Sequence, residues 1–389
     1  MLFGICKSIT KVLCVRVLPV LVVFLAMFIG WLSTKEIPEG TMFATVIPLM
    51  KGHLPTTIFG PYATPLTPSV PDDFEALPRP TNEMFLNLPG GERMPAQGLG
   101  MCCRASAYDE ETVRRTVLWY LLLGGRHIDT ADLYLNHRGV GKGIKEAISR
   151  GIPRSEIFVT TKLPARFFGF KASQNSVNRY LEELGLEYVD LLLLHFPNAD
   201  LIPLIKVEEC DSLKLSNKQC RIETWKGLSR ARENGYVRNI GVSNFNIEQL
   251  EQISSLGLAP IAAHQFQYNP WVPEWQQETF DYCQKKNIPV TAYSSLGAMM
   301  QSAKAFTVGT LKSIAKTHKK SVAQILLRWA LQMNASIIPG TGNPKHMKEN
   351  LGVYGFELSK QEMELITSLR NDAKAKEFFY FKMPVENDE

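Results

Sequence analysis

The chain has 389 residues, of which 45% are hydrophobic and 21% charged, and this composition is that of a folded protein with a large core. The formal net charge of +5 is small for this length, and no run of Lys and Arg is interleaved with aromatic residues. These features argue against a nucleic-acid partner. The length accommodates one barrel of about 250 residues or two ordinary domains.

The N-terminal segment contains a long uncharged stretch. Lys7, Lys11 and Arg16 precede residues 17–34, VLPVLVVFLAMFIGWLST, which carry no charge. This length is close to the minimum that spans about 30 Å of hydrocarbon. We expect an uncleaved single-pass membrane anchor, with a cleaved signal peptide as the alternative, because no small-residue cleavage site follows the stretch. The positive charges predict a cytoplasmic N-terminus, with the rest of the chain on the lumenal or extracytoplasmic side of the membrane.

The chain divides by composition into four parts. Residues 1–34 hold the cytosolic stub and the anchor helix, and residues 35–83 hold nine of the 23 prolines without clear periodicity. Such a segment is typical of an extended linker. The patterned region covers residues 84–370, and residues 371–389 form a C-terminal tail.

From residue 85 onward the sequence predicts a hairpin followed by alternating strands and helices. Pro89, Gly90 and Gly91 separate two short apolar segments, which is typical of a β-hairpin. Apolar strand candidates follow at residues 97–101, 126–129, 157–162, 190–195, 238–243, 261–266, 289–293 and 335–339. Helical patterns occur between them, for instance at residues 109–123, 173–184, 222–234, 246–256 and 274–287. Eight alternating β/α units predict an α/β fold of the (β/α)8 TIM-barrel type.

The alternative fold is a doubly wound parallel sheet, which normally carries a glycine-rich nucleotide-binding turn. Neither a GxGxxG segment nor a Walker A sequence occurs in the chain. The barrel is therefore preferred, and any nucleotide must be bound by another device.

Four polar side chains lie at or just beyond the ends of predicted strands. Asp129 ends the segment HID, and Tyr134 follows five residues later. Lys162 ends IFVTTK, and His195 ends DLLLLH. Because the carboxyl ends of parallel strands meet on one side of a barrel, we expect these four residues to form one site.

These residue types suit proton transfer. A phenol has a pKa of about 10, and a neighbouring ammonium favours its ionised form, so Lys162 is expected to lower the pKa of Tyr134. A buried Lys162 needs a counter-ion, for which Asp129 is the nearest candidate. A neutral His195 can donate a ring N–H to a substrate oxygen and orient it. No Cys or His spacing indicates a metal site.

The motifs resemble those of the aldo-keto reductase family. They are DTADLY at 129–134, FVTTKL, LLLLHFP, GVSNFN at 241–246, QFQYNP at 265–270 and TAYSSLG at 291–297, in the family's order. The resemblance implies a monomeric catalytic barrel, closed at the bottom by the hairpin, that reduces small aldehydes or ketones with NAD(P)H. It also implies that Asp129, Tyr134, Lys162 and His195 are catalytic, with Tyr134 as the proton donor.

The resemblance further implies a set of cofactor-binding residues. Ser243, Asn244 and Gln265 occupy positions that bind the nicotinamide carboxamide, and Tyr293 the position that stacks on its ring. Asn244 is also suited to cap a helix that begins near Asn246. The remaining implied residues, around the pyrophosphate and the adenosine, are Ser294, Leu296, Gly340, Thr341, His346, Glu349 and Asn350.

The phosphate-binding end departs from the family pattern. Many members carry Lys-Ser and then an Arg, whose cations hold the 2′-phosphate of NADP. Gly340, Thr341 and His346 occupy these positions here, and Lys345 and Lys348 are out of register. The resemblance implies NADPH as the cofactor, and NADH is an alternative because the cations that hold the 2′-phosphate are missing.

Two further departures lie near the predicted site. His137 stands where the family often has an acidic residue, and Cys102 stands where a substrate-pocket Trp is common. We expect the first to change only a loop contact and the second to make the pocket wall smaller.

Cys210 and Cys220 bracket a short insertion, within residues 196–221 that have no readable pattern. A disulfide between them fits an oxidising lumen, and two reduced thiols are an equally open alternative.

A second class of function stays open. Some barrels that resemble this family act as cofactor-sensing regulatory subunits of membrane complexes, and an inactive barrel is a third possibility. Retention of all four candidate catalytic side chains favours an enzyme.

Overall fold

The computed structural model describes residues 74–102, 109–198, 206–297, 305 and 307–372. The predicted anchor at residues 17–34 lies outside these ranges, as do most of the predicted linker and tail. Within the described ranges, no helix is both long enough and apolar enough to cross a bilayer.

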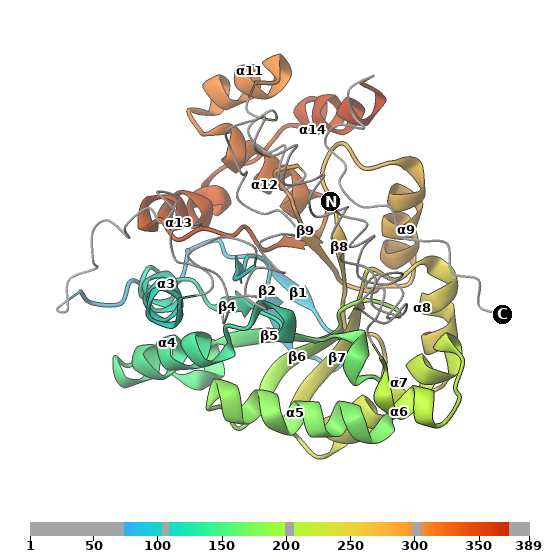
Figure 1. Cartoon of the computed structure of the whole chain (residues 1–389). Coiled ribbons are helices and arrows are strands. Elements are labelled where there is room, and N and C mark those ends of the chain that lie inside the picture. The colour runs from blue at the N-terminus through green and yellow to red at the C-terminus, as the bar shows by residue number, and fades with distance from the viewer. Residues whose placement is uncertain (1–73, 103–108, 199–205, 298–304, 306, 373–389) are drawn as a thin grey trace, which may run out of the picture.

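Parallel strands form a closed ring at the centre of the described part (Figure 1). In this 8-stranded sheet the strands lie in chain order. The ring closes where Gln97 pairs in parallel with Ile337, next to a 2.8 Å hydrogen bond from the Gly98 amide to the Ile337 carbonyl. This topology agrees with the predicted (β/α)8 barrel and not with a doubly wound sheet. The strands are β3 (Leu99–Gly100), β4 (His127–Asp129), β5 (Phe158–Leu163), β6 (Val189–Leu194), β7 (Val237–Ser243), β8 (His264–Gln267), β9 (Val290–Tyr293) and β10 (Ala335–Ile337).

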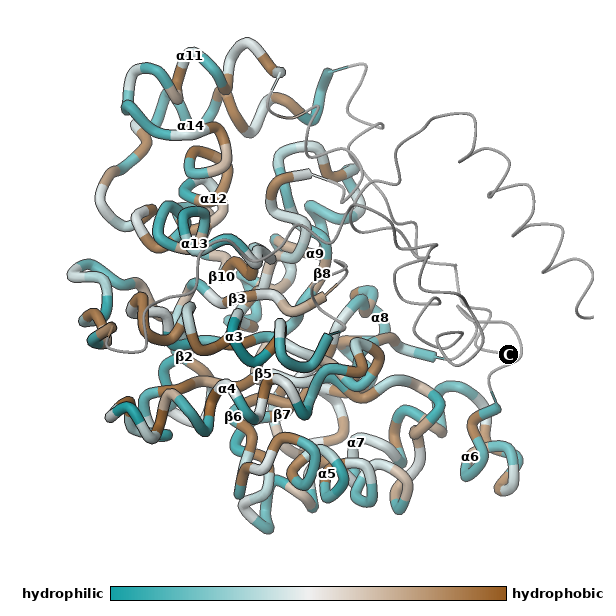
Figure 2. The backbone as a smooth tube through the Cα atoms, turned by 60° about the vertical axis from the view of Figure 1, so that its left-hand side comes forward, coloured by the Kyte–Doolittle hydropathy of each residue, from teal (hydrophilic) through white to brown (hydrophobic). Residues whose placement is uncertain are grey.

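Helices surround the strand ring (Figure 1). They show both apolar and polar residues along their length in Figure 2, as helices do when one face is buried and the other meets water. Most begin within four residues of the predicted positions; α7 begins five residues earlier because Ser216 forms a capping box with Gln219. The helices are α3 (Glu110–Leu122), α4 (His137–Ser149), α5 (Phe170–Leu184), α6 (Glu208–Ser212), α7 (Asn217–Glu233), α8 (Ile247–Ser254), α9 (Glu274–Lys285), α11 (Gly309–His318), α12 (Val322–Gln332), α13 (Pro344–Leu351) and α14 (Lys360–Thr367).

The predicted hairpin is present and closes one end of the barrel. Strands β1 (Phe85–Asn87) and β2 (Arg93–Pro95) pair antiparallel. Leu86 and Met94 pack in one buried cluster with Phe158, which begins β5, and with barrel residues such as Leu191. The hairpin therefore covers the amino-terminal ends of the strands and leaves their carboxyl ends for a site.

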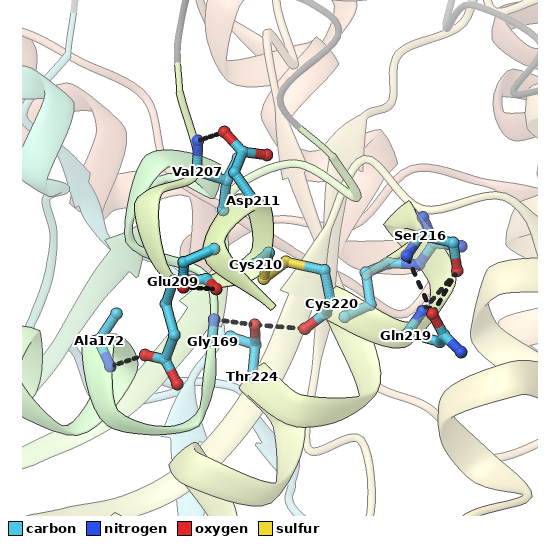
Figure 3. The surroundings of a disulfide bond; sticks show 12 residues. Gly169, Ala172, Val207, Glu209, Cys210, Asp211, Ser216, Gln219, Cys220 and Thr224 are labelled. Carbon is cyan, nitrogen blue, oxygen red and sulfur yellow. Dashed lines mark hydrogen bonds between the residues drawn. A yellow bond between two sulfur atoms is a disulfide. The ribbon is translucent and has the colours of Figure 1, made fainter. Parts of the chain in front are cut away.

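The insertion after β6 contains a disulfide that the sequence left undecided (Figure 3). Cys210 of α6 and Cys220 of α7 are bonded, with their Cα atoms 5.6 Å apart. Beside the bridge, the Glu209 carboxylate accepts hydrogen bonds from the amides of Lys171 and Ala172 at 3.1 and 2.6 Å. A carboxylate at a helix N-terminus satisfies amides that have no partner within the helix, so this part of the insertion is attached to α5.

Candidate active site

The barrel brings the four predicted catalytic residues to the carboxyl ends of three neighbouring strands. Asp129 ends β4, Lys162 is the penultimate residue of β5, and His195 follows β6 directly. Tyr134 ends a short 3-10 helix, η4 (Asp132–Tyr134), that follows β4. All four side chains are buried, with Lys162 at 0% and Tyr134 at 8% exposure.

Lys162 is the centre of this cluster. Its Nζ donates to Asp129 Oδ1 at 2.5 Å and to the Thr130 carbonyl at 2.9 Å. It also lies 3.4 Å from the Tyr134 hydroxyl, a long donor distance. On the other side of Tyr134, the His195 ring lies edge-to-face at a centroid distance of 5.7 Å. The phenol and the imidazole are therefore direct neighbours at the carboxyl ends of the strands.

The structure corrects the expectation that Lys162 lowers the pKa of Tyr134. Burial, and then the negative charge of Asp129, hold the pKa of the Tyr134 phenol well above its ordinary value. Burial also lowers the pKa of Lys162, although its bond to Asp129 opposes that change. Because the ammonium is neutralised at 2.5 Å by Asp129, little of its charge acts on the more distant phenol. Tyr134 is therefore protonated at neutral pH, as a proton donor must be.

His195 is held in its neutral form. Burial, followed by the positive charge of Lys162, places the pKa of His195 well below its ordinary value. Its Nδ1 atom has no hydrogen-bond partner among the described residues. A neutral ring presents one N–H donor, so His195 can bind a carbonyl oxygen without competing as an acid.

The residues predicted to hold a carboxamide lie against the catalytic cluster. Gln265 Nε2 donates to Asp129 Oδ2 at 2.8 Å. Asn244 Nδ2 donates to the His195 carbonyl at 2.9 Å and to Ser243 Oγ at 3.0 Å. The Tyr293 hydroxyl donates to Asn244 Oδ1 at 2.8 Å. Strands β7, β8 and β9 thus continue the polar surface that β4, β5 and β6 begin.

These contacts decide between the two interpretations of Asn244. The cap of α8 is Asn246, whose side chain and that of Gln249 form a capping box. Asn244 has a positive φ of 63° and turns its amide towards β6 and β9 instead. The helix-cap alternative for Asn244 is therefore wrong.

Gln267 is a polar residue of this region that sequence reasoning missed. It is 2% exposed, and neither its Nε2 nor its Oε1 has a partner among the described residues. Buried amides are nearly always hydrogen-bonded, so these atoms, with His195 Nδ1, fit a polar molecule bound at the strand ends. The sequence did indicate Gln267, because side chains two residues apart on a strand point to the same face and Gln265 was already predicted to face the site.

The predicted phosphate-binding residues lie beyond the neighbouring strands β9 and β10. Ser294 begins a turn in which the Gly297 amide donates to its carbonyl at 3.0 Å, and Leu296 lies in the same turn. Gly340 and Thr341 follow β10, where Gly340 is exposed and Thr341 Oγ1 accepts a bond from the Asn343 amide at 3.0 Å. His346, Glu349 and Asn350 lie on α13. The structure therefore places this set beside the carboxamide set and outside the catalytic cluster.

His137 has a larger structural role than the loop contact expected from the sequence. It begins α4 and is 3% exposed. One ring nitrogen pairs with Thr161 Oγ1 and the other with Glu183 Oε2, each at 2.8 Å. His137 thus connects α4 to β5, beside Lys162, and to α5.

The chain is similar to known reductases in sequence and structure. Residues 98–371 match the model of the Aldo/keto reductase family. A 9,11-endoperoxide prostaglandin H2 reductase of Trypanosoma cruzi is 36% identical over 295 residues, which are 75% of this chain and 94% of that protein. An NAD(P)H-dependent D-xylose reductase of Candida tropicalis is 33% identical over 73% of this chain and 91% of that protein.

Solved structures agree with these sequence matches. The Bombyx mori aldo-keto reductase in complex with NADP has a TM-score of 0.66 and 31% identity, over 78% of this chain and 98% of that one. Together with the barrel and its converging polar residues, these matches establish the identity of the described part. The chain belongs to the aldo/keto reductase family, whose members are NAD(P)-dependent oxidoreductases.

Proposed function

We propose that this protein reduces the carbonyl group of a small aldehyde or ketone to an alcohol, with Tyr134 as the proton donor. The observation that carries the proposal is the convergence of a protonated phenol, a neutral imidazole and a buried ion pair at one point. The Tyr134 and His195 rings are direct neighbours, and we place the carbonyl oxygen where both side chains can donate to it. NADPH, when bound, would supply the hydride that the carbonyl carbon accepts.

In this mechanism each residue of the cluster has one task. His195 donates a hydrogen bond to the carbonyl oxygen and sets its direction. Tyr134 gives its proton to that oxygen as negative charge develops there. Lys162, 3.4 Å from the phenol oxygen, then donates a hydrogen bond to the phenolate, and Asp129 keeps Lys162 charged inside the barrel.

The cofactor side of the proposal uses residues that are already oriented. Ser243, Asn244 and Gln265 would bind the carboxamide, and Tyr293 would lie against the nicotinamide ring. Ser294 and Leu296, with His346, Glu349 and Asn350 of α13, would contact the phosphates and adenosine. NADPH is the proposed cofactor, since the similar Bombyx mori enzyme holds NADP. NADH is the alternative, because the aligned cations for a 2′-phosphate are absent at Gly340 and Thr341.

The test compares three full-length proteins on a panel of small aldehydes and ketones, with NADPH and with NADH. Tyr134→Phe should lower kcat by about 10²- to 10⁴-fold while NADPH still binds, measured by fluorescence titration. Tyr268→Phe is the matched control, because it removes another buried phenol hydroxyl, bonded to Gln277, away from the cluster. A Tyr134→Phe protein that works at the wild-type rate contradicts the mechanism. A wild type that binds NADPH tightly but turns over nothing favours the regulatory-subunit alternative.

We also propose that the barrel works in an oxidising compartment. The disulfide between Cys210 and Cys220 supports this location, since such bonds are rare where thiols are kept reduced. The predicted anchor at residues 17–34 would then hold the barrel on the lumenal or extracytoplasmic side. In intact membrane vesicles the barrel should resist added protease, and a barrel digested from the cytoplasmic side contradicts this proposal.

A further inference from the structure

Asp132 is a buried carboxylate that takes no part in the chemistry proposed above, although it lies two residues before Tyr134. It is 4% exposed. Its oxygens accept bonds from Arg179 Nη2 at 3.1 Å, Arg166 Nη2 at 3.3 Å and the Tyr180 hydroxyl at 3.2 Å. Three donors from two other elements therefore converge on one side chain of the segment that carries the phenol.

The segment itself has little internal support. Helix η4 is a single turn, with bonds from the Tyr134 amide to the Ala131 carbonyl and from the Leu135 amide to the Asp132 carbonyl, both at 3.1 Å. Leu135, which follows, has a positive φ of 53° and is 52% exposed. One turn of helix fixes little by itself. The orientation of Tyr134 therefore depends on contacts that η4 makes with other elements.

Asp132 supplies such a contact on the outer side of the barrel wall. Inside the barrel, Asp129 of β4 pairs with Lys162 of β5 at 2.5 Å. Outside, Asp132 pairs with Arg166 of η6 (Ala165–Phe167), the 3-10 helix that follows β5. The two stretches of chain at and after the ends of β4 and β5 are thus joined twice, and Tyr134 lies two residues after the second contact.

We infer that Asp132 is a positioning residue that sets the distance between the Tyr134 hydroxyl and Lys162 without touching either group. The inference rests on the proposed function of Tyr134 as proton donor. Arg179 and Tyr180 of α5 and Arg166 of η6 all donate to the Asp132 carboxylate, so η4 is attached to two other elements. Because the Lys162–Tyr134 distance is already 3.4 Å, a further displacement of η4 removes that bond.

The test uses Asp132→Asn, which keeps the shape of the side chain and removes its charge. The matched control is Asp190→Asn. Asp190 is also buried, at 5% exposure, and accepts from Arg154 Nη2 at 2.8 Å, but it lies at the other end of the barrel, near the start of β6. Both variants lose an arginine–carboxylate bond, and only the first lies beside Tyr134.

Asp132→Asn should lower kcat about 10- to 100-fold, as small displacements of a reacting group do, with the carbonyl KM and the NADPH dissociation constant within about twofold of wild type. The solvent deuterium isotope effect on kcat should rise, because a misplaced donor makes proton transfer slower. Asp190→Asn should change neither kcat nor the isotope effect, even if its melting temperature falls by as much as that of Asp132→Asn. Equal losses of kcat in the two variants, or none in Asp132→Asn, overturn the inference.

A second readout does not need turnover. With tyrosines labelled at Cζ with ¹³C, the Tyr134 resonance, assigned by its loss in Tyr134→Phe, should shift in Asp132→Asn and not in Asp190→Asn. If the Tyr134 resonance does not shift in Asp132→Asn, the inference is overturned. If wild type reduces no carbonyl but the resonance does shift, only the proposed function has failed. If Asp132→Asn does not fold, Arg179→Gln removes the shortest of its arginine bonds from a side chain that is 38% exposed and should give the same effects, smaller.

Discussion

Asp129 and Lys162 form an ion pair of 2.5 Å whose side chains are 2% and 0% exposed. Removing one member of such a pair leaves a charge buried without its counter-ion. Lys162→Met should therefore lower the free energy of unfolding by about 3–5 kcal/mol, measured by urea denaturation.

The double variant Asp129→Asn with Lys162→Met tests why Lys162→Met is destabilised. The cause is either the lost attraction between the two groups or the carboxylate that stays buried without a partner. The double variant should be more stable than Lys162→Met, although kcat stays low in both, because it buries no isolated carboxylate. If the two substitutions destabilise additively, the pair is not coupled in the folded protein.

Cofactor preference is expected to follow charge at the position of Gly340. Gly340→Lys places a cation where a 2′-phosphate would lie and should lower the KM for NADPH about tenfold, with little effect on NADH. The measurement is kcat/KM for both cofactors with one fixed aldehyde. Lys348→Ala serves as the control, because it changes a charge on α13 at a position that is not aligned with the family's 2′-phosphate cations. An equal change for NADH and NADPH would mean that Gly340 does not face that phosphate.

Acid should destabilise the fold through buried histidines, among them His127 and His264. Burial lowers the pKa of His127 to about 4 and that of His264 to about 3. Both values are below the ordinary pKa of 6.5, so at pH values between the folded and the ordinary pKa the unfolded chain binds more protons than the folded one. The contribution of the neutral histidines to the free energy of unfolding is therefore fully present above pH 6.5 and decreases as pH falls. At pH 5 we expect a loss of about 2 kcal/mol from each residue.

His127→Gln tests this origin of the pH dependence. His127 pairs with the Pro95 carbonyl and with Thr160 Oγ1, at 3.2 and 3.0 Å, and glutamine retains a donor and an acceptor without titrating. Urea denaturation at pH 7 and pH 5 should show a pH effect smaller by about 2 kcal/mol than in wild type. An unchanged pH effect would exclude His127 as a cause.

The disulfide should stabilise the insertion and the helix it adjoins. With a sequence separation of 10 residues, its removal in Cys210→Ser with Cys220→Ser should cost about 2–3 kcal/mol. Differential scanning calorimetry should show a lower melting temperature for this variant than for wild type. The difference should largely disappear when both proteins are treated with dithiothreitol, and a difference that persists would point to packing by the sulfur atoms instead.

The strands and the site residues at their ends were predictable because both leave local signals. A short apolar run that stops at Asp129, Lys162 or His195 defines a strand end, and parallel topology then brings strand ends together. The hairpin could be read from Pro89, Gly90 and Gly91 in the same way. These features depend on the chemical character of neighbouring residues along the chain.

What could not be predicted depends on distances between residues far apart in sequence. The raised pKa of Tyr134 follows from burial of its phenol and then from the nearby charge of Asp129, and sequence spacing reveals neither. The contacts of His137 with Thr161 and Glu183 likewise join residues 24 and 46 positions away. The pairing of Cys210 and Cys220 required the orientation of their Cβ atoms, and sequence separation does not give it.

The pairing of Gln97 with Ile337, which closes the barrel, has a consequence for synthesis of the chain. Ile337 closes the ring against Gln97, so about 240 further residues must leave the ribosome after Gln97 before the last strand can join the first. Until then the sheet has two open edges, and the Lys162 ammonium is not yet sealed from water. Synthesis that stops short of β10 leaves an incomplete ring with unpaired edges, a species that chaperones and proteases would recognise.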